Sequence, residues 1–379
     1  MPQRRFASIH VVGTNGKSSV TAMTAALLEA AGFATGAYVS PHAERWSERV
    51  RVRGEEIGPE AFAAAVGRVA ESVPAVERTL PEGDFVTQFE ASTAAAFVAL
   101  AGAGVEVAVV EAGLGGRLDA TNVLPSRATA LTSIGLEHTE YLGETVTEIA
   151  AEKLAVLNEQ SALVVGALAP EVRELAERTA AERHARLLDA SAPLRAGGLD
   201  ERAPYLASNL AVAVAAAQVI AGPLRPELVA DVAAGLSLPG RMEVVASDPP
   251  LILDAAHNPD GARAVADALG STAAGRPVIG CLAVLAGKDA ESILEALAPH
   301  LAAAVCTEIP PEALENAGRP GASSLGAAEL AEAAGRAGIA VVEASPDAVA
   351  ALERARSLAR ERGGVALVAG SHYLLPHGS

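Results

Sequence analysis

Aromatic residues and cysteines are scarce in this chain. Only 3% of the residues are aromatic although 50% are hydrophobic, so the core must be built from Ala, Val and Leu. The two cysteines, Cys281 and Cys306, both sit in apolar, strand-like runs. This placement favours buried, reduced thiols over a disulfide or a metal pair.

Excess positive charge and a membrane-length apolar run are also missing. The formal net charge is −17, so we expect no basic face and no nucleic-acid partner. The negative net charge fits a protein that binds small ligands at local Lys, Arg or Mg²⁺ sites. The longest apolar segment, 210–222, is too short and Ala-rich to span a bilayer, and no signal-peptide stretch follows Arg5. We therefore expect a cytoplasmic protein with no membrane partner.

A chain of 379 residues is too long for one compact core, which predicts two domains, 1–238 and 239–379. Strand-like runs alternate with helical patterns, which predicts an α/β fold with a P-loop-type parallel-sheet ATPase domain and a smaller Rossmann-like domain. In the first domain we expect strands over 8–12, 36–40, 105–110, 128–134, 161–166 and 185–189, and helices over 18–31, 59–78, 88–101, 146–157 and 209–221. In the second we expect strands over 251–254, 277–283, 302–307, 339–343 and 364–370, helices over 259–269, 289–301, 325–336 and 346–362, and an irregular loop over 308–325.

The segment 8–19 reads Ser-Ile-His-Val-Val-Gly-Thr-Asn-Gly-Lys-Ser-Ser, an apolar run followed by a glycine-bounded turn and a helix start. Such a turn directs backbone N–H groups and a helix N-terminus at one point, which suits a phosphate. Lys17 can neutralise the β/γ oxygens, and the hydroxyl of Ser18 or Ser19 can sit beside Mg²⁺. A plain strand–helix turn with a solvated lysine is the alternative. We favour ATP binding.

Further polar residues follow the predicted strands. Glu111 ends a buried strand, where open α/β sheets bind ligands, and a glycine-rich run follows it. His138 follows the strand over 128–134, and Lys153 lies on the next helix; by themselves they also fit a structural histidine and a solvated lysine. In the second half, Asp254 and His257 follow the strand over 251–254, and Asn258 is expected to cap the helix after it.

Together these segments resemble the folylpolyglutamate synthase/dihydrofolate synthase family within the Mur ligase superfamily. The resemblance runs through the whole chain in order, and the run Gly-Leu-Gly-Gly-Arg-Leu-Asp-Ala-Thr-Asn at 113–122 is nearly diagnostic. It implies an ATP-dependent amide ligase in which ATP converts a carboxylate to an acyl phosphate that the amine of L-glutamate attacks. The other substrate would be dihydropteroate or a reduced folate such as tetrahydrofolate, and the protein would be a monomer.

The resemblance also implies roles for individual residues. Lys17, Lys153 and His257 would be catalytic, and Lys153 would carry an N6-carboxylate that supports a second Mg²⁺. The nucleotide would contact Thr14, Asn15, Gly16, Lys17, Ser18, Ser19, Asn209, Arg241 and Asp254. Mg²⁺ would be held by Ser40, Glu111 and His138. The pterin or folate would lie near Thr87, Phe89, Glu90, Arg117 and Asp119.

Departures from the family pattern keep two alternatives open. Ser18, Glu137 and Ala255 stand where the family commonly has Gly, Asp and Gly, and the chain begins only a few residues before its first strand. Relatives generally carry about thirty more N-terminal residues that help to close the pterin pocket. The alternatives are a superfamily ligase acting on a different carboxylate, and a non-catalytic nucleotide-binding relative.

Overall fold

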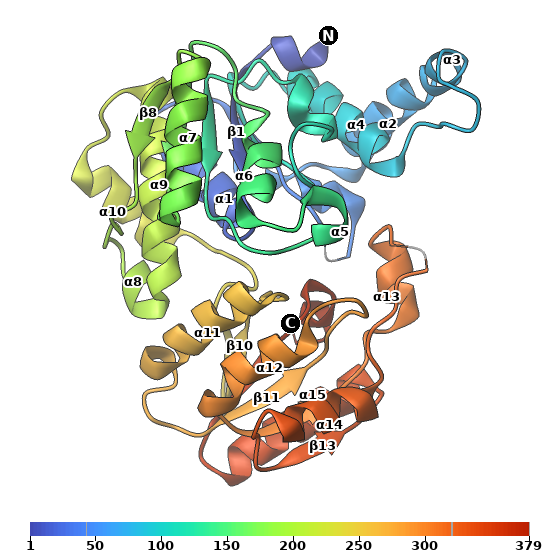
Figure 1. Cartoon of the computed structure of the whole chain (residues 1–379), viewed down its shortest axis with the longest axis vertical. Helices are drawn as coiled ribbons and strands as arrows, with labels where there is room; N and C mark the ends of the chain where they lie inside the picture. Colours follow the sequence, from blue (N-terminus) through green and yellow to red (C-terminus); the bar gives the residue numbers. More distant parts are fainter. Residues whose placement is uncertain (43, 320, 379) are drawn as a thin grey trace. The chain divides into compact units, whose positions relative to one another are not determined.

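The computed structural model describes residues 1–42, 44–319 and 321–378, which form two compact units (Figure 1). The first unit comprises Met1–His42, Trp46–Gly197 and Ala207–Leu236. The second comprises Gly198–Leu206 and the chain from Ser237 to its C-terminal end, with Glu44 and Arg45. A domain boundary at 238 stays a prediction, and the segment Gly198–Leu206 groups with the second unit although it lies before that boundary.

The first unit contains an eight-stranded sheet with the order β4-β3-β2-β5-β1-β6-β7-β8. The strands are β1 (Ala7–Val12), β2 (Thr35–Tyr38), β3 (Val50–Val52), β4 (Glu55–Glu56), β5 (Val107–Glu111), β6 (Ala128–Leu131), β7 (Ala162–Val165) and β8 (Arg186–Asp189). The pairs from β2 to β8 are parallel, whereas β3 and β4 add antiparallel pairs at one edge. The expected α/β fold is confirmed, and these two short antiparallel strands are an addition that the sequence pattern did not predict.

Helices cover both faces of this sheet, and consecutive residues of its central strands are therefore buried. Ile9, Val11 and Val12 are fully buried, as are Ala108 to Val110. Near-continuous burial of this kind is what a parallel sheet between two helical layers requires. The helices of this unit are α1 (Lys17–Ala30), α2 (Pro59–Ala70), α3 (Val73–Glu77), α4 (Gln88–Gly102), α5 (Thr139–Leu142), α6 (Val146–Leu154), α7 (Pro170–Glu182), most of α9 (Pro204–Ala221) and α10 (Pro226–Gly235).

Two helix predictions in this unit are wrong in their limits. The helix expected over 59–78 is interrupted at Glu71 and Ser72 and resumes as α3. Pro74 in the first turn of α3 explains the break, because a proline inside a continuous helix removes a hydrogen bond and clashes with the preceding turn. The helix expected to begin at Asn209 begins at Pro204, since proline is well tolerated in a first turn.

Helix α9 is longer than the apolar segment considered above. Its 18 residues have a mean hydropathy of 1.5, so by length and composition it passes as a membrane-crossing helix, the one candidate in the described part of the chain. In the structure 44% of this span is buried, and Leu210, Ala213 and Ala217 on one face are fully buried. Burial of one face is the pattern of a helix that packs against a protein core.

The second unit contains a six-stranded sheet with the order β13-β12-β11-β14-β10-β9. Its strands are β9 (Glu243–Ser247), β10 (Pro250–Leu253), β11 (Val278–Leu282), β12 (Leu301–Cys306), β13 (Val342–Ala344) and β14 (Val365–Ala369). All pairs are parallel except β9 with β10. The helices are α8 (Leu199–Arg202), α11 (Pro259–Thr272), α12 (Ala290–Leu297), α13 (Pro311–Asn316), α14 (Ala327–Arg336) and α15 (Ala348–Glu361).

Both cysteines lie on neighbouring central strands of this sheet, Cys281 on β11 and Cys306 on β12, and both are buried and free. Burial raises the pKa of each thiol to about 12, so both are protonated at neutral pH.

Two further predictions for this unit are corrected by the structure. The loop expected over 308–325 contains α13, and the helix expected over 346–362 begins at Ala348 with Asp347 as its N-cap. The Asp347 carboxylate accepts a hydrogen bond from the Ala350 N–H at 2.7 Å.

The cap of α15 gives a test of this fold. We expect Asp347→Ala to lower the free energy of unfolding by about 1 kcal/mol, because one N–H of the first turn loses its acceptor. Ser345→Ala, two residues earlier, is the matched control and should change it by less than about 0.5 kcal/mol. Urea unfolding followed by circular dichroism measures both, and equal effects of the two substitutions would contradict the assignment.

Candidate functional site

The glycine-bounded turn after β1 is held by the segment that follows β6. The Thr14 hydroxyl contacts both the Gly135 carbonyl, at 3.2 Å, and the Gly135 N–H, at 3.1 Å. The Thr132 hydroxyl donates to the Asn15 carbonyl at 2.6 Å, and the Asn15 N–H donates to the Ser133 hydroxyl at 3.1 Å. Because β1 and β6 are adjacent parallel strands, their carboxyl ends meet at one sheet edge. Thr132, Ser133 and Gly135 were not among the predicted site residues.

Two glycines of the turn leave no room for a side chain. A Cβ on Gly13 would lie 2.0 Å from the Thr132 Oγ1, and one on Gly16 would lie 2.5 Å from the Asn209 Oδ1. Gly16 also has a φ of 84°, which favours glycine at this N-cap of α1. The close approach at Gly16 shows that Asn209, which lies inside α9, is beside the turn. The turn therefore forms a tight cradle of backbone at a helix N-terminus, which fits a phosphate group.

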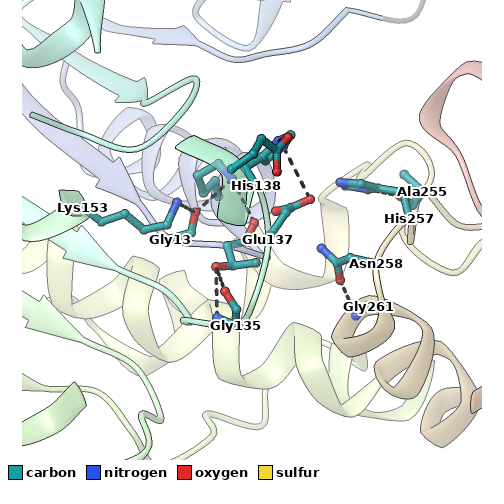
Figure 2. A network of polar contacts seen from close by, with 12 residues as sticks. Gly13, Gly135, Glu137, His138, Lys153, Ala255, His257, Asn258 and Gly261 are labelled. Atoms are coloured by element: carbon teal, nitrogen blue, oxygen red, sulfur yellow. Dashed lines mark hydrogen bonds and ion pairs between the residues drawn. The ribbon is translucent and has the colours of Figure 1, made fainter. Parts of the chain in front are cut away.

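Two lysine side chains meet at one carbonyl of this turn. The Lys17 Nζ donates to the carbonyls of Gly13, at 3.1 Å, and Thr14, at 2.9 Å, and the Lys153 Nζ donates to the same Gly13 carbonyl at 2.9 Å (Figure 2). Lys153 is buried rather than solvated. Burial, and then the positive charge of Lys17, lower the pKa of Lys153 to about 7. This shift makes the neutral amine of Lys153 more accessible near neutral pH than that of an ordinary lysine.

Glu111, at the end of β5, lies against the beginning of α1 and the end of β2. Its Oε1 accepts from the Ser18 hydroxyl at 3.1 Å, and its Oε2 accepts from the Ser40 N–H at 3.3 Å. The structure therefore brings together Ser18, Ser40 and Glu111, three of the predicted phosphate and metal residues. Two hydroxyl groups and a carboxylate are oxygen ligands of the kind that Mg²⁺ prefers.

The third predicted metal residue, His138, lies on the loop after β6 between two carboxylates. Its Nε2 is 3.9 Å from Glu137 and its Nδ1 is 3.9 Å from Glu140 (Figure 2). The backbone of His138 has a φ of 52°, which is uncommon for residues other than glycine, and the residue forms the N-cap of α5. Strained backbone of this kind is often retained at binding sites.

Ser19, by contrast, points into the protein. Its side chain is 2% exposed, and its hydroxyl has no hydrogen-bond partner among the described residues. It is therefore a buried helix residue beside the turn rather than part of the surface that the turn presents.

Asp119 organises the glycine-rich loop after β5. Its Oδ2 accepts from the N–H groups of Gly113 and Leu114, at 2.9 and 2.8 Å, and its Oδ1 accepts from the N–H and hydroxyl groups of Thr121. The residue is buried. Four donors occupy this carboxylate, so its observed role is to fix the loop, where the sequence suggested a substrate contact.

This loop is linked to β1 by His10. The His10 Nε2 lies 2.7 Å from the Thr121 hydroxyl, which itself donates to Asp119, so the proton of the ring is on Nε2. Burial lowers the pKa of His10 to about 4, although the charge of Asp119 opposes the shift. His10 is therefore neutral at pH 7. Sequence analysis overlooked it because a histidine inside an apolar strand gives no local signal.

The other predicted substrate residues lie around the same loop. Thr87 and Glu90 form a capping box at the start of α4, in which each side chain accepts from the other's N–H. The Phe89 ring lies so near Gly113 that a Cβ there would be 2.4 Å from it. Arg117 is exposed and pairs with Glu152 at 3.0 Å, next to Lys153.

In the second unit, Asp254 is buried at the end of β10. Its Oδ2 accepts from the Tyr205 hydroxyl at 2.8 Å and the Met242 N–H at 2.9 Å, and its Oδ1 accepts from the Ala256 N–H at 2.8 Å. Burial raises the pKa of this carboxyl, and the charge of Arg241 opposes the rise. Tyr205 was not predicted, because nothing in the local pattern marks it.

His257 follows Asp254 on the same loop. Its Nδ1 lies 2.9 Å from the Ala255 carbonyl, and its ring centroid is 4.6 Å from that of His372. Asn258 caps α11 as predicted, accepting from the Gly261 N–H at 2.8 Å (Figure 2). This loop thus carries the His257 imidazole three residues after the buried Asp254 carboxylate.

Comparison with known proteins matches both units. The Mur ligase middle domain matches residues 11–192, and the Mur ligase glutamate ligase domain matches residues 240–372. The dihydrofolate synthase/folylpolyglutamate synthase of Mycobacterium tuberculosis is 34% identical over 345 residues, which are 81% of this chain and 71% of that protein.

Solved structures agree. A Mycobacterium tuberculosis folylpolyglutamate synthase complexed with ADP and AMPPCP superposes with a TM-score of 0.91 at 31% identity, covering 100% of this chain and 91% of that one. A bifunctional folylpolyglutamate synthase/dihydrofolate synthase with Mn, AMPPNP and L-glutamate bound has a TM-score of 0.79 at 28% identity, covering 100% of this chain and 90% of that one.

The buried His10 predicts a pH dependence of stability. Its pKa is about 4 in the folded chain and 6.5 when exposed, so the unfolded state binds a proton first as the pH falls. The resulting stability loss begins below pH 6.5 and is complete near pH 4; between pH 7 and pH 5 it is about 2 kcal/mol.

We expect His10→Gln to be less stable than the wild type at pH 7 but to lose about 2 kcal/mol less on going to pH 5. Urea unfolding at the two pH values measures the difference between the proteins, which cancels the contribution of other groups. Parallel pH dependence in both would show that His10 is not a buried neutral imidazole.

Proposed function

The chain belongs to the folylpolyglutamate synthase/dihydrofolate synthase family of Mur ligases, and on that premise we propose how its residues perform an ATP-dependent amide ligation. The substrates are ATP, L-glutamate and a folate-type carboxylate, either dihydropteroate or a reduced folate. The carboxylate takes the γ-phosphoryl group of ATP, and the glutamate amine displaces phosphate from the acyl phosphate. The proposal places this monomeric enzyme in the cytoplasm.

The turn after β1 supports the ATP part of the proposal. Gly16 is the N-cap of α1 in this turn, and the N–H groups of a helix's first turn and the positive end of its dipole favour anions. Lys17, which contacts the turn carbonyls of Gly13 and Thr14, is close enough to turn toward the phosphates. This cradle, with no space for a Cβ at Gly13 or Gly16, is the observation that carries the proposal.

The residues present also fit a divalent cation. Ser18, Ser40 and Glu111 supply oxygen atoms at the end of β5, and His138 supplies a ring nitrogen from the loop after β6. A bound Mg²⁺ would neutralise the charge that develops on the transferred phosphoryl group. Glu111 itself fixes the first turn of α1, so the residue that we assign to the metal also positions the phosphate loop.

Lys153 is assigned to the second metal through an N6-carboxylate. A carbamate forms when a neutral amine attacks CO₂ and releases a proton, and the pKa of about 7 makes the neutral amine available. The product is an anion in place of a cation beside Lys17. Asn209, Arg241 and Asp254 stay proposed nucleotide contacts, and His257 stays a proposed catalytic residue. Phe89 and Arg117 stay proposed contacts of the pterin or folate.

A steady-state assay of ADP release tests the reaction. We expect release to require both L-glutamate and either dihydropteroate or tetrahydrofolate, and Lys17→Ala to reduce kcat/KM about 100-fold because a charge on the phosphates is lost. A peptidoglycan precursor serves as the alternative acceptor. Stimulation by that precursor alone would establish a different carboxylate as substrate, and stimulation by none would leave a nucleotide-binding relative.

A second experiment tests the carbamate. We expect Lys153→Ala to lower kcat about 100-fold and added acetate or bicarbonate to restore part of the activity. Lys153→Arg, which keeps a positive charge but cannot be carboxylated, is the matched control and should be inactive without rescue. A ¹³C signal from wild-type protein in ¹³C-bicarbonate, absent in both variants, measures the modification. Full activity of Lys153→Ala would exclude this role.

A further inference from the structure

A polar cavity lies at the edge of the first sheet opposite to the turn after β1. It has a volume of about 860 Å³ and is lined by the loops before β6, β7 and β8 and by the chain that leaves α6. The phosphate-binding turn, Glu111 and His138 follow the carboxyl ends of strands, whereas this cavity lies at the amino ends. The four residues of β6 separate the two edges by about 13 Å.

Three arginines line this cavity, Arg127, Arg183 and Arg186, against one acidic residue, Glu159. Arg186 is the register partner of Ala162, whose other partner, Ala128, directly follows Arg127. The Cα atoms of the two arginines are therefore two strands, or about 10 Å, apart. Guanidinium groups at the ends of such side chains can reach one ligand. In a chain of net charge −17, this local excess of positive charge is unusual.

None of these three guanidinium groups forms an ion pair with another described residue. By contrast, Arg173 pairs with Asp189 at 2.9 Å, and Arg354 pairs with Glu343 at 2.8 Å. Arg183 has a structural explanation, because it follows α7 and a cation is favoured at a helix C-terminus. Arg127 and Arg186 are not on helices and have no such explanation.

The floor of the cavity is rigid and polar. The Asn158 side chain donates to the Leu124 carbonyl at 3.1 Å and the Ser126 hydroxyl at 2.8 Å, and the Ser161 hydroxyl donates to the Asn158 carbonyl at 2.6 Å. The arginine backbone is fixed as well: the Gln160 N–H donates to the Arg183 carbonyl and the Arg186 N–H to the Ser161 carbonyl, each at 2.9 Å. The backbone that carries Arg183 and Arg186 is therefore fixed, whereas the side chains of all three arginines are exposed.

We propose that Arg127, Arg183 and Arg186 form a binding site for a small oxyanion with two or more negative charges. Arginine forks bind phosphate and carboxylate oxygens in the same bidentate way, so a phosphate compound and an oligocarboxylate are the two sources of this chemistry. A cavity of about 860 Å³ accommodates a molecule of metabolite size. The site is independent of the ligase reaction and binds without turnover.

Isothermal titration calorimetry tests the proposal with inorganic pyrophosphate and with citrate as probes. Saturating Mg²⁺·AMPPNP is present throughout, so that the turn after β1 is not available. We expect one molecule of at least one probe to bind with a dissociation constant below about 1 mM. Binding of pyrophosphate alone assigns the site to phosphate compounds, binding of citrate alone assigns it to carboxylates, and no binding of either overturns the proposal.

Substitutions locate the binding. Arg127→Gln and Arg186→Gln should each weaken it about tenfold, because each removes a charge-assisted fork. The matched control is Arg178→Gln, an exposed arginine on α7 that does not line the cavity. Equal weakening by the control, or none in the first two variants, would overturn the proposal.

A site-resolved measurement accompanies these. Phenylglyoxal labelling followed by mass spectrometry should show that the bound probe protects Arg127, Arg183 and Arg186 but leaves Arg178 reactive. Because all these residues are exposed, folding of the variants is expected to be unchanged and is checked by circular dichroism. Protection of Arg178 to the same degree would mean that the probe only screens surface charge.

Discussion

One carbonyl oxygen, that of Gly13, accepts hydrogen bonds from two lysine side chains, and the chemistry of the first unit depends on this contact. Two ammonium groups on one acceptor repel each other. Burial and Lys17 lower the pKa of Lys153, while Glu137, Asp119 and Glu152 oppose the shift. An anion on the turn, or a negative charge on Lys153 itself, relieves the repulsion. Under the proposed function, a phosphate at this turn would meet two lysine side chains that lie beside it.

The order of strands explains why residues far apart in the chain reach this turn. In the sheet β5, β1 and β6 are neighbours, so the loops that follow them leave one edge side by side. Thr14 consequently contacts Gly135, and Ser18 contacts Glu111, across separations of 121 and 93 residues. His10 and Thr121 add a second connection between β1 and the loop after β5, below the edge. The loops are fixed relative to one another by hydrogen bonds and not only by the sheet.

The sequence predicted features that depend on neighbours along the chain and missed those that depend on tertiary contacts. The strand–turn–helix at Gly13–Lys17 and the Asn258 cap are local, and both appear in the structure. Lys153 is buried because α6 packs beside the turn. The local sequence alone therefore also fitted a solvated lysine. Thr87 and Glu90 were expected at the substrate, and in the structure they form a capping box, for which Thr-x-x-Glu is the local pattern. Asp119 was also expected there, and it accepts from the N–H groups of Gly113 and Leu114.

The two edges of the first sheet require different ways of holding an anion. At the carboxyl edge, α1 begins, so free N–H groups and the positive end of the helix dipole contribute to binding. At the amino edge, α6 and α7 end, and their C-terminal carbonyls oppose a negative charge. Backbone alone cannot bind an anion there. Only side chains with fixed positive charge can, and this explains why the cavity at the amino edge is lined by arginines where the turn at the carboxyl edge is made of glycines.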